Sequence, residues 1–188
     1  MYWHLIPFIH AVLFGLSAVV LRTFIVGRNP VAFVGGDSAR DFASFCFFIC
    51  LPAIDAGLVG WYAVTLDPGP LLMGVETLRW LGVALLVLAS SWVIYAQAFM
   101  GSNWSMGVVN DSELVVKGPF AISRHPIYLG IRMTMTGQLL VISSWPALAL
   151  WLVNELLVQI QVRFEEEVML DRFGDRYREY CTRVRRWI

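Results

Sequence analysis

Charged residues are scarce in this sequence. Only 15% of its 188 residues are Asp, Glu, Lys or Arg, whereas 58% are hydrophobic. A soluble domain of this length cannot bury so much apolar surface. The formal net charge is zero, so bulk electrostatics indicates no nucleic acid or other charged partner. The composition therefore excludes an ordinary soluble domain and points to lipid as the solvent.

Cysteines are few, and two kinds of binding motif are missing. Cys46 and Cys50 lie four residues apart in an apolar run, where small buried hydrophobes are a better interpretation than a disulfide or a metal site. The sequence has no metal-ligand spacing and no glycine-rich phosphate loop. We therefore expect neither a metal nor a bound nucleotide phosphate.

Long apolar runs dominate what remains. The first 21 residues have no basic leader and no clear cleavage site, which favours a retained first span over a signal peptide. A spanning helix needs about 20 mostly apolar residues. Five stretches approach that length, at 4–22, 42–63, 78–99, 126–143 and 146–164. The sequence thus predicts an all-α integral membrane protein with five transmembrane helices in a single domain, 1–188.

The positive charges predict the orientation of these spans. Nearly all Lys and Arg residues fall in the first connection, the third connection and the C-terminal tail. With five spans, these three segments lie on one side, which the positive-inside rule makes cytoplasmic. The N-terminus is then expected outside.

Two charged motifs flank the last pair of spans. Arg124-His125-Pro126 opens the fourth span, and three glutamates, 165–167, follow the fifth. Only SSWP separates these spans, so they should form a hairpin that returns to the face it left. Each motif alone would mark only a membrane interface. Together they predict a cluster of Arg, His and carboxylates beside a hydrophobic wall.

Two further segments could cover this cluster. The third connection is long for a bundle loop, and its ELVVKGPF stretch has short β-like character with a turn at Gly118-Pro119. Apolar residues after the glutamates recur at helical spacing, which predicts an amphipathic helical segment on the cytoplasmic face. Gly174-Asp175 could end one helix and cap the next.

The motifs as a set resemble a known family. NWS (103–105), VVKGPFAISRHPIYLG (115–130) and EEEVMLDRFGDRYREYCTRVRR (165–186) are similar to the isoprenylcysteine carboxyl methyltransferases (ICMT) and the related phospholipid methyltransferases. These enzymes show an RHPxYxG element, a glutamate pair and an FGxxYxxY tail. The resemblance covers about 100–188, the expected catalytic part. The family tail often ends with a proline after its last basic residues, whereas this sequence ends RRWI, which leaves the docking of the tail open.

The resemblance implies an integral membrane methyltransferase that uses S-adenosylmethionine, releases S-adenosylhomocysteine and takes a lipophilic substrate from the bilayer. It also implies a cytoplasmic cofactor-binding loop. His125 and Glu166 are the expected catalytic residues. The residues expected to contact the cofactor are Arg124, His125, Tyr128, Glu165 and Glu166, with backbone around Val116 and Gly118.

Arg132 is a further candidate, which the resemblance does not supply. It lies seven residues after His125, two turns along the same helix face. Charged side chains inside a membrane are costly and are functional by default. We expect Arg132 to point into the site as a catalytic residue that orients the acceptor. The alternatives are snorkelling to the interface or a structural pair with Glu155 or Asn154.

Three more residues complete the expected substrate site. Asn103 and Trp104 could place a polar group and an aromatic wall near the acceptor, although an interfacial Trp is more often a membrane anchor. Glu155 is assigned to the substrate site with Arg132.

The sequence is compatible with several kinds of methyl acceptor. A prenylated cysteine carboxylate is most like the family, and the alternatives are a phospholipid amine or a small hydrophobic thiol. An amine needs a base to take its proton, which His125 or a glutamate could supply. A non-catalytic membrane scaffold or carrier is the competing class of protein, and binding of S-adenosylmethionine would argue against it.

Overall fold

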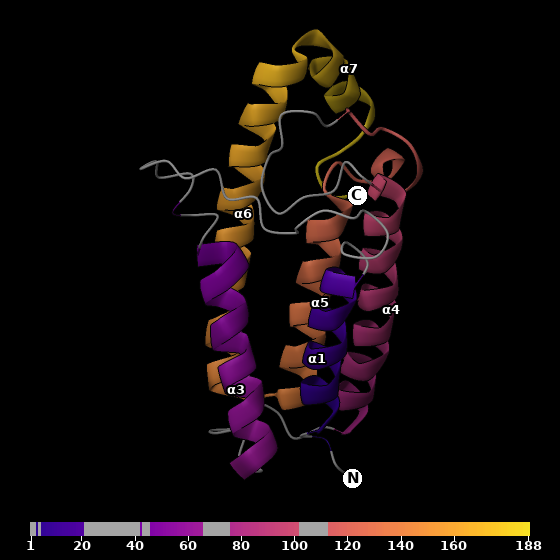
Figure 1. Cartoon of the computed structure of the whole chain (residues 1–188). Coiled ribbons are helices and arrows are strands. Elements are labelled where there is room, and N and C mark those ends of the chain that lie inside the picture. Colours follow the sequence, from indigo (N-terminus) through magenta and orange to yellow (C-terminus); the bar gives the residue numbers. More distant parts are fainter. Residues whose placement is uncertain (1–2, 4, 21–41, 43–45, 66–75, 102–112) are drawn as a thin grey trace.

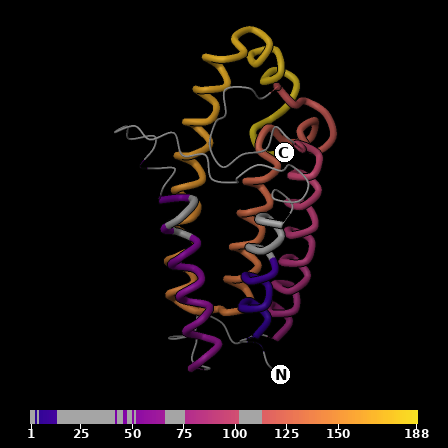
Figure 2. The backbone as a smooth tube through the Cα atoms, in the orientation of Figure 1, coloured from indigo at the N-terminus to yellow at the C-terminus, as the bar shows by residue number. Residues whose placement is uncertain are grey.

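A computed structural model describes residues 3, 5–20, 42, 46–65, 76–101 and 113–188. Its long helices run side by side as a bundle, and α7 lies across one end (Figure 1). The tube in Figure 2 shows the same arrangement, with the chain turning back sharply between α5 and α6. The elements are α1 (Leu5–Val20), the π-helix η2 (Cys46–Cys50), α3 (Leu51–Thr65), α4 (Glu76–Met100), the 3-10 helix η4 (Gly118–Ala121), α5 (Pro126–Ile142), α6 (Trp145–Phe173) and α7 (Asp175–Arg183).

The α5–α6 hairpin is made by local capping. Pro126 is the first residue of α5, where its missing N–H costs nothing. Ser143 ends α5 in the left-handed conformation, with a φ of 54°. The Ser144 side chain then accepts a 3.4 Å hydrogen bond from the backbone N–H of Ala147 and caps α6. These adjacent caps reverse the chain within two residues, and the predicted hairpin is confirmed.

Glycines let α4 and α5 approach each other closely. A Cβ added at Gly82 would lie 2.7 Å from the backbone oxygen of Gly137, and one added at Gly137 would lie 2.9 Å from Leu86. Small residues at such crossings are typical of helix pairs in membranes, because backbones can then pack directly. The contact fixes α5, and with it the start of the charged site, against α4.

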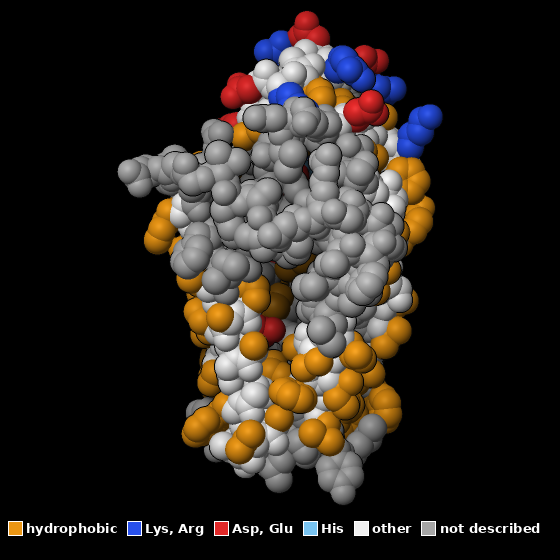
Figure 3. All heavy atoms as spheres, in the orientation of Figure 1, with side chains coloured by type: hydrophobic (Ala, Val, Ile, Leu, Met, Phe, Trp, Pro, Cys, Tyr) orange, Lys and Arg blue, Asp and Glu red, His pale blue; other side chains and the backbone are white. Residues whose placement is uncertain are grey.

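On the described part of the visible face, hydrophobic side chains gather along the bundle away from α7, whereas charged side chains gather at the α7 end (Figure 3). Val64 is 84% exposed and Leu156 is 62% exposed. Helices α4 and α6 are long and apolar enough to cross a membrane, judged by length and composition. A helix overlaps each of the five predicted spans, and the five-span topology stays a prediction.

Two local expectations need correction. In the ELVVKGPF stretch, residues 113–116 have no regular structure and Gly118–Ala121 form a 3-10 helix, so the β-like character is wrong there. Gly118 has a φ of +59° and Pro119 has no N–H to give to a strand. The last long helix also continues to Phe173 instead of ending near 164. No helix breaker occurs before Gly174, which has a φ of 51° and separates α6 from α7 as predicted.

The glycine contact gives a matched test. Gly82→Ala and Gly60→Ala both replace a helical glycine, which by propensity alone gains up to about 1 kcal/mol. Only Gly82 has its new Cβ against a neighbouring backbone, because nothing lies within 4 Å of a Cβ at Gly60. We expect Gly82→Ala to cost about 1–3 kcal/mol through overpacking and Gly60→Ala to cost nothing. Thermal unfolding in detergent measures both, and equal melting temperatures would contradict the close α4–α5 approach.

Candidate functional site

One carboxylate stands at the centre of the charged site. Glu166 Oε1 lies 2.9 Å from Nη2 of Arg124 and 3.2 Å from Nε2 of His125. Arg186 approaches the same carboxylate with both Nε, at 3.1 Å from Oε1, and Nη2, at 2.5 Å from Oε2. We call these four residues the Glu166 cluster. The predicted meeting of the RHP element with the glutamates is therefore observed, and the partner that the sequence did not reveal is Arg186.

The backbone ties the C-terminal segment to the start of α5. The backbone N–H of Arg124 donates to the carbonyl of Arg185 at 3.0 Å. The Ser123 hydroxyl donates to the carbonyl of Arg186 at 2.9 Å and accepts from the backbone N–H of His125 at 3.1 Å. Ser123 is fully buried. These bonds hold the segment after α7 beside the RHP element, so that Arg186 can reach Glu166.

Helix α7 packs against the site through two tyrosines. Tyr177 and Tyr180 are buried, and the predicted amphipathic character of this segment is confirmed. The Tyr180 hydroxyl donates a 2.6 Å hydrogen bond to the carbonyl of Phe120. Burial raises the pKa of Tyr180 to about 12 and also raises the pKa of Tyr177. Both phenols therefore stay neutral at physiological pH.

The electrostatics of the cluster favour fixed charges. The hydrogen bond to Glu166 is the main cause that raises the pKa of Arg186 above its usual value, so this guanidinium keeps its charge. The Glu166 side chain is only 15% exposed. A carboxylate shared among two guanidinium groups and an imidazole has little capacity left to accept a proton, because each hydrogen bond from a cation stabilises its charged form.

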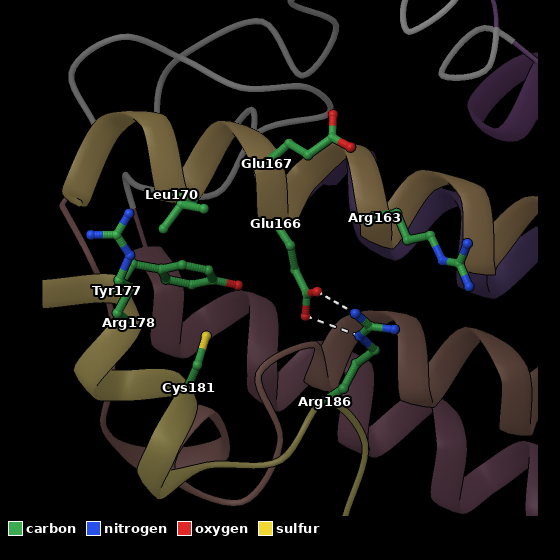
Figure 4. Close-up of a pocket in the computed structure, with 8 residues that line it drawn as sticks. All are labelled: Arg163, Glu166, Glu167, Leu170, Tyr177, Arg178, Cys181 and Arg186. Atoms are coloured by element: carbon green, nitrogen blue, oxygen red, sulfur yellow. Dashed lines mark hydrogen bonds and ion pairs between the residues drawn. The ribbon is translucent and has the colours of Figure 1, made fainter. Parts of the chain in front are cut away.

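A cavity of about 590 Å³ opens beside the cluster, between α6 and α7. In Figure 4, Glu166 reaches from α6 toward Arg186, and Tyr177 and Cys181 of α7 lie along the other side. The lining carries charges of both signs and one aromatic ring. Its residues are Arg163, Glu166, Glu167, Leu170, Tyr177, Arg178, Cys181 and Arg186.

The second glutamate of the predicted pair lies beside another site residue. The Tyr128 hydroxyl is close to the side chains of Glu165 and Gln161. The Tyr128 ring lies 5.9 Å from the ring of His125 and 5.5 Å from that of Phe47. Glu165 and Glu166 therefore both contact the first turn of α5 or its cap, one through Tyr128 and the other through Arg124 and His125.

Arg132 forms a pair on the neighbouring helix. Its Nε donates to both carboxylate oxygens of Glu155, at 3.0 and 2.9 Å. The pairing with Glu155 that the sequence left open as an alternative is thus observed, whereas the side-chain amide of Asn154 has no hydrogen-bond partner among the described residues. The Arg132 guanidinium also lies 4.5 Å from the ring centroid of Trp187. No pattern in the sequence predicted this stacking partner.

Among the residues expected to contact the cofactor, Glu166 lines the cavity, whereas Arg124, His125, Tyr128 and Glu165 lie outside its lining. Val116 and Gly118 do not line it. A Cβ at Gly118 would meet the Phe99 ring at 2.5 Å, so this glycine is needed for packing against α4. Asn103 and Trp104 lie outside the described residues.

The fold and site together define a helical membrane protein with a polar site at one end of its bundle. The phospholipid methyltransferase family model matches residues 77–176, which is more than half of the chain. The chain belongs to this family.

One solved structure gives the fold independently. The chain is similar to the eukaryotic intramembrane Ras methyltransferase ICMT (isoprenylcysteine carboxyl methyltransferase), with a TM-score of 0.62 and 22% sequence identity. The match covers 92% of this chain and 61% of that chain, so this chain spans less than two thirds of the neighbour's length. A search of curated proteins gave no match. The ICMT-like helical fold is shown by this similarity.

The Glu166 cluster predicts a large difference between two substitutions of glutamate. Glu166→Gln keeps the shape but leaves two guanidinium groups without a countercharge, which costs about 3 kcal/mol for a buried network. Glu179→Gln is the control, because the Glu179–Arg183 pair is exposed and 3.6 Å long and should contribute less than about 1 kcal/mol. The free energy of unfolding in detergent checks this. Similar losses for the two variants would show that the cluster does not hold the C-terminal segment.

Proposed function

We propose that the protein is an S-adenosylmethionine-dependent methyltransferase of the membrane that methylates a lipophilic acceptor, with a prenylcysteine-type carboxylate as the leading candidate. The observation that carries this proposal is the Glu166 cluster. It joins the two motifs that resemble the family, at the end of the α5–α6 hairpin and beside a cavity. Family membership and the ICMT-like fold support the same conclusion.

The cavity suits the methyl donor chemically. The amino-acid end of S-adenosylmethionine carries an ammonium and a carboxylate, and the cavity lining offers both carboxylates and guanidinium groups. Glu167 could bind the ammonium group, and Arg163 or Arg178 could bind the carboxylate. The Tyr177 ring provides an aromatic surface for a positively charged or planar group. A volume of about 590 Å³ lies within the usual range for small-molecule sites.

Methyl transfer from S-adenosylmethionine requires little from the protein beyond positioning of the reactants. When bound, S-adenosylmethionine supplies a methyl carbon on a positive sulfur, and transfer to a carboxylate breaks the C–S bond, forms a C–O bond and leaves the electron pair on the sulfur of S-adenosylhomocysteine. The residues around the site would orient the reactants and exclude water. Glu166 is saturated by cations and makes a poor base, which favours an acceptor that arrives without a proton to lose.

A phospholipid amine is the second candidate, because the matching family is that of the phospholipid methyltransferases. Such an acceptor must lose a proton during the reaction. Glu165, whose side chain lies close to the Tyr128 hydroxyl, is the carboxylate next to the cluster that could take it. A small hydrophobic thiol is the third candidate acceptor.

The proposed topology follows from the charge distribution. Five spans would place the Glu166 cluster, α7 and the third connection on the cytoplasmic side and the N-terminus outside. The acceptor would then enter from the bilayer, and the methyl donor from the cytoplasm.

The first test is binding and transfer by purified protein in nanodiscs. We expect saturable calorimetric binding of S-adenosylhomocysteine, and transfer of a labelled methyl group to an S-prenylated N-acylcysteine but not to its methyl ester. Transfer to phosphatidylethanolamine instead would select the second candidate. If well-folded protein neither binds S-adenosylhomocysteine nor transfers the label, the methyltransferase proposal fails and the scaffold or carrier class stands.

The Arg132–Glu155 pair can be separated into structural and substrate roles. Arg132→Met leaves Glu155 unpaired, so a structural pair predicts recovery of activity in the double variant Arg132→Met/Glu155→Gln. An acceptor-orienting Arg132 predicts that KM for the acceptor stays about tenfold or more above the native value in both, since each charged hydrogen bond contributes about 1.5–3 kcal/mol. Michaelis kinetics decide between them. Native KM in the double variant would remove Arg132 from the substrate site.

A further inference from the structure

Trp187 stands between the two polar groups of the site. Its ring centroid is 6.2 Å from that of His125 and 4.5 Å from the Arg132 guanidinium carbon. His125 belongs to the Glu166 cluster, whereas Arg132 lies two turns further along α5. The indole therefore bridges the distance along α5 between the cluster and the Arg132–Glu155 pair. It also packs against the apolar cluster that contains Tyr128 and Met135.

The backbone holds this ring in place. Trp187 follows Arg186 directly, and Arg186 is fixed through its side chain to Glu166 and through its carbonyl to Ser123. Arg185 is bound to the backbone of Arg124. These three interactions of Arg185 and Arg186 therefore also position the Trp187 ring.

Arg132 retains unused hydrogen-bonding capacity. Both of its hydrogen bonds to Glu155 come from Nε, and no described residue accepts a hydrogen bond from its two terminal nitrogens. Trp187 stacks on the guanidinium, and stacking leaves the edge of a guanidinium group available for hydrogen bonds. The Arg132 side chain is 29% exposed. Charged side chains within a membrane protein's spans are usually paired, and an anionic group matches the charge of these donors.

We propose that Trp187 is a specificity-determining residue of the acceptor subsite, in which it holds the guanidinium of Arg132 for the anionic group of a lipid acceptor and forms the wall against which the first part of the acceptor's apolar chain packs. Glu155 is a positioning residue in this subsite, because it fixes Arg132 through Nε alone. The inference rests on the proposed function and deepens it, since it specifies an acceptor with an anion next to a slim apolar chain.

The size and position of the ring define the expected selectivity. Removing the indole widens the space beside Arg132 and removes the stacking surface for its guanidinium. Acceptor binding should therefore weaken, and discrimination between narrow and bulky apolar chains should decrease. The methyl-donor cavity does not include Trp187, so binding of S-adenosylhomocysteine should not change.

The test compares Trp187→Ala, Trp187→Phe and the control Trp145→Ala in nanodiscs. Trp145 is 56% exposed and begins α6, far along that helix from Glu166. Calorimetric titration with an S-prenylated N-acylcysteine, without methyl donor, should give a Kd raised about tenfold in Trp187→Ala, as expected for loss of an aromatic residue that contacts the acceptor. Trp187→Phe should lie between this variant and the native protein, and Trp145→Ala should match the native protein.

The outcomes separate the inference from the proposed function. An unchanged acceptor Kd in Trp187→Ala would overturn the inference, and so would an equal rise in the Kd of S-adenosylhomocysteine, which would show that Trp187 only holds the fold together. If the alanine variant does not fold, the Kd values of Trp187→Phe for the acceptor and for S-adenosylhomocysteine decide whether the inference holds. If the native protein does not bind S-adenosylhomocysteine, the proposed function is refuted. The acceptor titration needs no methyl donor, so it would still measure the role of Trp187.

Discussion

The shared carboxylate of Glu166 is the interaction on which the site depends. It binds two arginines and a histidine that come from the start of α5 and from the segment after α7. These segments are far apart in the sequence, and Glu166 joins their side chains while hydrogen bonds from residues 123 and 124 to the carbonyls of residues 185 and 186 also join them. Removing the carboxylate would leave neighbouring positive charges that repel one another in a partly buried place, where water screens them poorly.

The α5–α6 hairpin brings residues that are far apart in the sequence close together in space. Adjacent caps at Ser143 and Ser144 make the reversal short, so residues at matching heights of the two helices face each other. The Arg132–Glu155 pair lies within the hairpin and the Glu166 cluster at its open end. Direct packing of Gly82 on Gly137 then sets α5 against α4. A hairpin of this kind presents polar groups at two depths along the bundle, one beside the cavity and one further along α5.

Two consecutive residues of the segment after α7 contact the Glu166 cluster and the Arg132–Glu155 pair. Arg186 binds Glu166, and Trp187 stacks on Arg132. The same segment would therefore support the donor side of the proposed reaction with one side chain and the acceptor side with the next. Its position depends on backbone hydrogen bonds to residues 123 and 124. Substitutions there should therefore affect both the Glu166 cluster and the Arg132–Glu155 pair.

The sequence by itself determined the helical membrane fold and the meeting of Arg124 and His125 with the glutamates, because apolar length, a short turn and charge position are local properties. Only the tertiary structure decided which glutamate binds the cations, that Arg132 pairs with Glu155, and that Trp187 covers it. Several arginines crowd the tail with similar spacing, and nothing local distinguishes Arg186 from its neighbours. That choice follows from how α7 packs through Tyr177 and Tyr180 and from where the chain leaves it, which are contacts between residues distant in sequence.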